Sequence, residues 1–185
     1  MKRHVWMGAL LVGALLLPAA RAEALVITPA SGPVLTGNQT SQAQINAFIA
    51  AILGSAGAVE LYKQNVGGGE SGLLAGSYQT EFFNSPTDPE DATITYTGGA
   101  FVGGTSFLLV KDGNATPAWY LFNLTSLGWN GTEQLVLQNF WVGRGAISHV
   151  ALYGTPTTVP ELSTLSLLAA GLLGVGALRR RSQLA

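Results

Sequence analysis

Turn-forming residues divide the central part of the chain, from residue 59 to residue 158, into short segments. Clusters of Gly, Asn, Asp and Pro mark the divisions: Gly67-Gly68-Gly69, 85–89, Gly98-Gly99, Asp112-Gly113-Asn114 and Asn130-Gly131. Asn-Gly and Asp-Gly pairs tolerate the positive φ angles of tight hairpins. Between the clusters, apolar and polar residues alternate with the period of a β-strand.

Seven candidate strands lie between these turns: Val59–Lys63, Ser77–Phe83, Ala92–Tyr96, Thr105–Lys111, Ala118–Leu124, Glu133–Leu137 and Ala146–Tyr153. Short strands separated by turn signals, without helices between them, are typical of an antiparallel sandwich. The sequence therefore predicts a mainly β fold, a seven-stranded antiparallel β-sandwich that is jelly-roll-like.

One amphipathic helix is expected before the first of these strands. Apolar residues recur there at helical spacing: Ile45, Phe48, Ile49, Ile52 and Leu53. Thr40 or Ser41 can cap the start of this helix, and Gly54 can end it. We therefore predict a helix over Gln42 to Leu53, after an extended lead-in at residues 25–39.

The two ends of the chain have the composition of targeting segments. Residues 1–22 contain the parts of a secretory signal peptide: Lys2 and Arg3, the apolar run Met7–Leu17, and a small-x-small cleavage signature at Ala20 and Ala22 before Glu23. An N-terminal membrane anchor is disfavoured because the run is shorter than the roughly 17–25 residues of a membrane span.

The C-terminal segment has the pattern of a transmembrane helix. Residues 162–178 form 17 positions without a charge, and Arg179, Arg180 and Arg181 follow directly. Because positive residues stay on the cytoplasmic side, the N-terminus of this helix is predicted to lie outside. A buried core helix would not need three adjacent arginines.

Residues 159–164 carry the sequence Val159, Pro160, Glu161, Leu162, Ser163, Thr164. Followed by the apolar segment and the arginines, this motif resembles the PEP-CTERM sorting signal of Gram-negative bacteria. Proteins of that family usually carry proline where Leu162 stands. The resemblance implies processing by signal peptidase and an exosortase, transit through the inner membrane, and a host that makes exopolysaccharide or biofilm. A plain single-pass anchor is the alternative.

The second half of the exported region also resembles a recurrent ectodomain of PEP-CTERM proteins. The matching stretches are 107–114, 117–122, 129–132 and 145–154. No established activity accompanies this resemblance. The resulting organisation is a signal peptide at 1–22, an exported β-sandwich domain at 23–158 and a sorting tail at 159–185.

The composition excludes several classes of function. The chain has no cysteine, so disulfides, thiol catalysis and cysteine-based metal sites are ruled out. Residues 23–158 carry three basic residues against nine acidic residues, a net charge of −6. Nucleic-acid binding needs a clustered basic surface, so no nucleic-acid partner is expected. A polyanionic polysaccharide should be repelled unless Ca²⁺ bridges it.

Catalytic groups are sparse in residues 23–158. His149 is the single histidine, and strand alternation places Ser148 on the opposite face from it. A hydrogen-bonded structural histidine is the favoured interpretation. Nothing in the sequence places Glu81 or Glu133 across a cleft from another carboxylate. A hydrolase using His149 and Glu133 is therefore the least favoured function, and no catalytic residues are predicted.

Acidic residues in one loop are the only candidates for a metal site. Asn84, Asp88, Glu90 and Asp91 crowd a proline-containing segment, and such oxygen ligands suit Ca²⁺. The spacing does not match an EF-hand loop. A solvated turn without a metal or other cofactor is the favoured interpretation.

One tryptophan is a candidate for glycan contact. Trp129 and Asn130 lie in a Gly-Trp-Asn-Gly turn, where a ring could stack on a sugar, whereas Trp119 alternates with Leu121 as a core residue does. The sequence predicts an exported surface or extracellular-matrix protein with a structural or adhesive role in biofilm. A carbohydrate-binding module that recognises matrix glycan is the alternative.

Overall fold

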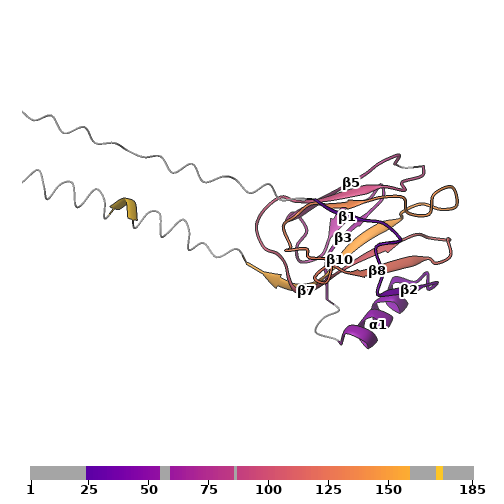
Figure 1. Ribbon diagram of the computed structural model, residues 1–185, viewed down its shortest axis with the longest axis horizontal. Helices are drawn as coiled ribbons and strands as arrows, with labels where there is room; N and C mark the ends of the chain where they lie inside the picture. Colours follow the sequence, from indigo (N-terminus) through magenta and orange to yellow (C-terminus); the bar gives the residue numbers. More distant parts are fainter. Residues whose placement is uncertain (1–23, 55–58, 86, 159–169, 173–185) are drawn as a thin grey trace, which may run out of the picture.

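The computed structural model describes residues 24–54, 59–85, 87–158 and 170–172 of the chain (Figure 1). Within these residues the protein is mainly β, with ten strands in two sheets, the helix α1 and a helical stretch at 170–172. The two sheets pack face to face around a shared apolar core. The predicted fold class is confirmed at this level.

The smaller sheet has four strands. Their order is β1 (Leu25–Ile27), β9 (Leu135–Leu137), β6 (Ala92–Tyr96) and β5 (Tyr78–Phe82). The pairs β5–β6 and β6–β9 are antiparallel, whereas β1 pairs with β9 in parallel. The expectation of a wholly antiparallel fold is therefore wrong at this edge, where the lead-in to the domain adds a short parallel strand.

The larger sheet has six strands, all paired antiparallel. Their order is β2 (Leu35–Gly37), β8 (Trp119–Asn123), β7 (Phe101–Lys111), β10 (His149–Thr157), β3 (Glu60–Asn65) and β4 (Glu70–Ser71). The long strands β7 and β10 form the centre. The hairpin turn after β7 and the segment entering β10 therefore meet at one end of the sheet.

Aromatic side chains fill much of the space between the sheets. The ring centroids of Tyr78 and Trp129 are 6.3 Å apart, and those of Tyr120 and Trp141 are 5.3 Å apart. The Tyr78 hydroxyl donates to the Gly131 carbonyl oxygen and accepts from the Val102 amide, both at 2.8 Å. These two bonds satisfy the one polar atom that Tyr78 brings into the core.

Helix α1 (Gln42–Leu53) covers the outer face of the larger sheet, beside β2 and β8 in Figure 1. Ile45 and Ile49 are fully buried in that contact, as their helical spacing predicts. Gly54 ends the helix at φ 75°, as expected. Ser41 occupies the N-cap position, but no side-chain capping hydrogen bond forms there.

All seven predicted strands are present, β6 with the predicted ends and the other six with shifted ends, but the predicted number of strands is too low. The three additional strands β1, β2 and β4 are two or three residues long. Such segments are too short to display an alternation, so residues 25–39 were predicted only as an extended lead-in.

The predicted terminal helices at 1–22 and 162–178 lie outside the described residues, except for 170–172, which are helical. No helix within the described part of the chain is long and apolar enough to cross a membrane.

Candidate functional site

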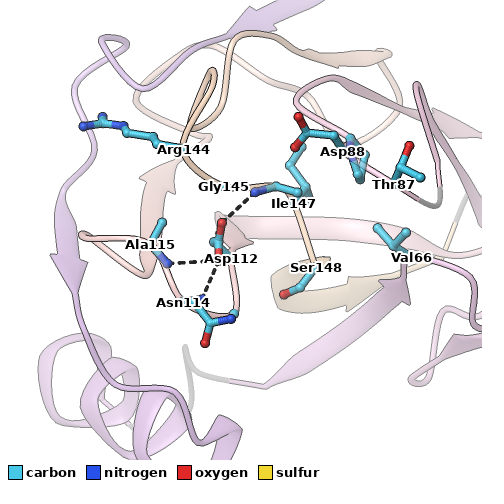
Figure 2. Close-up of a pocket in the computed structure, with 13 residues that line it drawn as sticks. Val66, Thr87, Asp88, Asp112, Asn114, Ala115, Arg144, Gly145, Ile147 and Ser148 are labelled. Atoms are coloured by element: carbon cyan, nitrogen blue, oxygen red, sulfur yellow. Dashed lines mark hydrogen bonds between the residues drawn. The ribbon is translucent and has the colours of Figure 1, made fainter.

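A buried carboxylate organises the turn between β7 and β8. Asp112 is 4% exposed, and its Oδ1 accepts from the backbone N–H groups of Asn114 and Ala115. Its Oδ2 accepts from the Ala146 amide at 2.7 Å (Figure 2). One side chain therefore fixes its own turn and also joins that turn to the segment entering β10. Charge-assisted hydrogen bonds of this kind are stronger than neutral ones.

Close approach at this junction depends on a glycine. A Cβ atom at Gly145 would collide with Asp112 Oδ2 and lie 3.1 Å from the Ala115 Cβ and 3.2 Å from the Trp141 Cβ. Real Cβ atoms are seldom so close to their neighbours, so a larger residue at position 145 would displace the Asp112 turn.

The loop of residues 84–91 is hydrogen-bonded to the segment that precedes β10. The Pro89 carbonyl accepts from the Ile147 amide at 2.7 Å. Glu90 Oε1 accepts from the Gly143 amide at 2.8 Å, and Asp91 Oδ1 accepts from the Asn139 amide at 2.7 Å. These carboxylates hold residues 139–147 in place, so the loop and that segment form one wall.

These three segments, together with Val66 after β3, border an open pocket of about 600 Å³. The residues that line it are Val66, Thr87, Asp88, Pro89, Asp112, Gly113, Asn114, Ala115, Arg144, Gly145, Ala146, Ile147 and Ser148. In Figure 2, Arg144 and Asp88 lie on opposite sides of Asp112. Val66, Pro89, Ala115 and Ile147 supply the apolar part of the lining.

The side chains predicted as calcium ligands make their contacts in different places. Glu90 and Asp91 bind different backbone amides, and Asp88 lies at the pocket. Among the described residues, no group of three or more His, Cys, Asp or Glu side chains is arranged to hold a metal ion. The interpretation of this loop as a solvated turn also needs correction. The carboxylates of Glu90 and Asp91 accept hydrogen bonds that join the loop to residues 139–147.

The predicted exposure of Trp129 is wrong. Its ring is 5% exposed, and its Nε1 donates to the Glu133 carbonyl at 2.8 Å. Positive φ angles at Gly128 and Gly131 turn the segment so that the ring packs on the core, where burial of its large apolar surface is favourable. A glycan cannot stack on a ring that is covered in this way.

Asn130 is exposed, but its side chain is already engaged. Its Oδ1 accepts from the Thr132 and Glu133 amides, and its Nδ2 donates to Glu133 Oε1 at 3.0 Å. The side chain therefore stabilises its own turn, as Asn commonly does. Neither Glu133 nor Glu81 lines the pocket.

His149 is buried between its sheet partners Lys111 on β7 and Asn65 on β3. Burial, with the charges of Lys63 and Lys111, lowers the pKa of His149 to about 3. Within the described part of the chain its Nε2 has no hydrogen-bond partner, so the expected hydrogen bond is missing at that atom. The Ser148 hydroxyl donates to the Lys111 carbonyl at 2.9 Å.

The pocket contains residues that the sequence pattern did not single out as functional, namely Asn114 and Arg144. The pattern identified 112–114 only as a turn. One sequence feature could have indicated the pocket, namely the isolated positive charge of Arg144 in a region dominated by acidic residues.

Other predicted site residues lie outside the described residues. These are Ala20, Ala22 and Glu23 at the cleavage site, the motif at 159–164, and Arg179, Arg180 and Arg181. Comparisons with protein families, with curated proteins and with solved structures found no match to the chain.

Proposed function

We propose that the chain is an exported protein, sorted through a PEP-CTERM-like tail to the cell surface or extracellular matrix, with a structural or adhesive role there. In this proposal the jelly-roll-like domain lies between a signal helix and a transmembrane helix. One observation carries it: β10 ends at Thr157, and the sorting motif begins at Val159. The sheet thus runs directly into the proposed tail, which supports a domain boundary at 158.

The domain acts without catalysis in this proposal. His149, on which a hydrolase would depend, has a pKa of about 3 and is buried. A base with that pKa takes up a proton poorly near neutral pH. Signal peptidase and an exosortase are the processing partners.

Fractionation of cells that carry an exosortase tests the sorting step. The wild-type chain is expected in the surface or matrix fraction, shortened by the tail. A Pro160→Ala, Glu161→Ala double variant should stay at full length in the inner membrane. An exosortase-deficient strain is the control. Recovery of the wild-type chain from the matrix with its tail intact would contradict the proposal.

Deletion of the gene tests the adhesive role separately. Loss of the protein should weaken biofilm cohesion, measured as the shear stress that removes a mature film. Complementation with the wild-type chain should restore cohesion, and complementation with the tail variant should not. Unchanged cohesion after deletion would remove the adhesive role while leaving the sorting proposal intact.

Glycan binding is the second candidate function. The pocket at Asp112 favours it, because ligand sites are concave, largely preformed and lined by apolar surface with a few polar groups. This candidate no longer depends on Trp129.

A further inference from the structure

The last part of β10 leaves the larger sheet as half of a two-stranded ribbon. β3 pairs with β10 as far as Tyr153, and β8 pairs with β7 over residues 107–111. Beyond those points, among the described strands, residues 155–157 of β10 pair only with residues 101–103 of β7. In Figure 1 this end of β10 projects from the domain beside β7. Two paired strands without a third are marginally stable by themselves.

The two strands of this ribbon are anchored unequally. On β7, Val102 is 1% exposed, and its amide donates to the Tyr78 hydroxyl at 2.8 Å. On β10, Thr155 and Pro156 are exposed, and proline has no backbone N–H to donate. The β10 half can therefore separate from the ribbon while the β7 half stays in the core.

An irregularity at Gly154 divides this end of β10 from the rest of the strand. The register of β10 against β7 shifts between Tyr153 and Thr155, so the ladder is interrupted there. A Cβ atom at Gly154 would lie 2.8 Å from the Val102 Cγ1, a distance that only glycine avoids. The interruption marks the point about which residues 155–157 can hinge.

The distance between the sheet and the sorting motif is short. Thr157 is the last residue of β10, and the motif begins at Val159. Two extended residues span at most about 7 Å, whereas a domain of this length has a radius of gyration of about 14 Å. The bulk of the domain would then keep an enzyme at the membrane away from the motif. Once β10 is free beyond Tyr153, the chain from there to Val159 can span about 20 Å.

We propose that residues 154–157 peel away from β7 during sorting and so deliver the motif at 159–164 to the exosortase. This step rests on the proposed sorting and gives it a conformational requirement within the domain. β7 keeps its place, because Val102 stays buried.

A disulfide that closes the ribbon tests the peeling step. The chain has no cysteine, so Gly103→Cys with Thr157→Cys allows a single disulfide. A Cβ atom at Gly103 would lie 2.9 Å from the Thr157 Cβ, within about 1 Å of the roughly 3.5–4.5 Å that disulfides favour. Tail removal is followed by pulse-chase immunoblotting in cells that carry an exosortase. The oxidised variant should lose its tail at least about tenfold more slowly than the wild type, because only the peeled population is processed.

Two further variants serve as controls. Thr157→Cys alone cannot form the disulfide and should be processed as the wild type is. The second keeps the disulfide and adds a flexible linker of six Gly and Ser residues after Thr158. That linker can extend to about 20 Å and should restore the wild-type rate. Alkylation of free thiols shows that the disulfide has formed.

The outcomes separate the peeling step from the sorting itself. Equal rates of tail removal in the oxidised variant and the wild type would overturn the peeling step and leave sorting intact. Slow removal that persists in the linker variant would also overturn it, since the disulfide would then act otherwise than through length. A wild-type chain that keeps its tail would remove the sorting proposal, and the peeling step with it.

Discussion

The two faces of the six-stranded sheet are covered in different ways. On the inner face, Leu108, Val110 and Phe122 meet the four-stranded sheet, in a layer rich in aromatic rings. On the outer face, Leu109 and Leu121 pack in a second cluster with Ile45 and Ile49 of α1, a helix of 12 residues. The inner layer is thus enclosed by hydrogen-bonded sheets on both sides, and the outer layer depends on one short element.

This double coverage explains the composition of the central strands. Along β7 every residue from Ser106 to Lys111 is buried, because consecutive side chains enter opposite covered layers. A strand with one solvated face would alternate instead. The continuous apolar run Phe107–Val110 is therefore the sequence signature of a strand that is covered on both faces.

Polar side chains lie in the outer layer at both ends of the stretch of β10 from His149 to Tyr153. At one end, the Tyr153 hydroxyl donates to Asn46 Oδ1 at 2.9 Å, which ties α1 to β10. At the other, His149 alternates with Ala151 and is buried near Lys111. The helix has no acidic residue in its first turn and no basic residue in its last turn, so its dipole is uncompensated. We therefore expect the outer layer to be less stable than the inner one.

The largest effect is expected from removing a ring of the inner layer. Trp129→Ala should lower the free energy of unfolding by about 3–5 kcal/mol, because it leaves a cavity that rigid sheets cannot close. Chemical denaturation followed by circular dichroism measures this. A loss below about 1 kcal/mol would show that Trp129 is not packed as described.

A smaller loss of unfolding free energy, with a more local effect, is expected for a substitution in the outer layer. Ile49→Ala should cost about 2–3 kcal/mol, since the helix can shift and partly close the space. Hydrogen exchange should show faster exchange in α1 and little change in β6. Equally faster hydrogen exchange in both elements would mean that the two layers unfold as one unit. The outer layer would then not be separately less stable.

These two layers also show what the sequence could predict. Helical spacing predicts α1, and strand-like segments between turn signals predict seven of the ten strands, because both depend on residues close in sequence. Trp129 was placed wrongly, since its Asn and Gly neighbours are typical of exposed turns. Its burial depends on Tyr78, 51 positions away in sequence. The sequence did not predict the pocket. Asp112 organises it by binding backbone amides, and every residue except proline has such an amide, so no sequence pattern shows which ones Asp112 binds.

Acid should weaken the outer layer through His149. Its pKa is about 3 in the folded state and near 6.5 when unfolded, so the unfolded chain binds a proton first as the pH falls. Stability from this group is complete above pH 6.5 and is lost as the pH falls toward 3. Between pH 7 and 4 the wild type should lose on the order of 3 kcal/mol more than His149→Leu.

Denaturant titrations at several pH values measure that difference. All other ionisable groups are common to both proteins, so their contribution cancels in the comparison. Parallel pH profiles of the wild type and His149→Leu would show that the imidazole is not buried beside Lys111 in solution.

The smallest effect is expected at the rim of the outer layer. Phe48 is 43% exposed and meets the edge of Trp119, with ring centroids 6.3 Å apart. Phe48→Ala should cost about 0.5–1 kcal/mol, because the ring loses one aromatic contact and little buried area. Phe48→Leu, which keeps apolar bulk, is the control and should recover part of the loss. A cost above that of Ile49→Ala would mean that the ring is covered in solution, and α1 would then be held by something beyond the sheet.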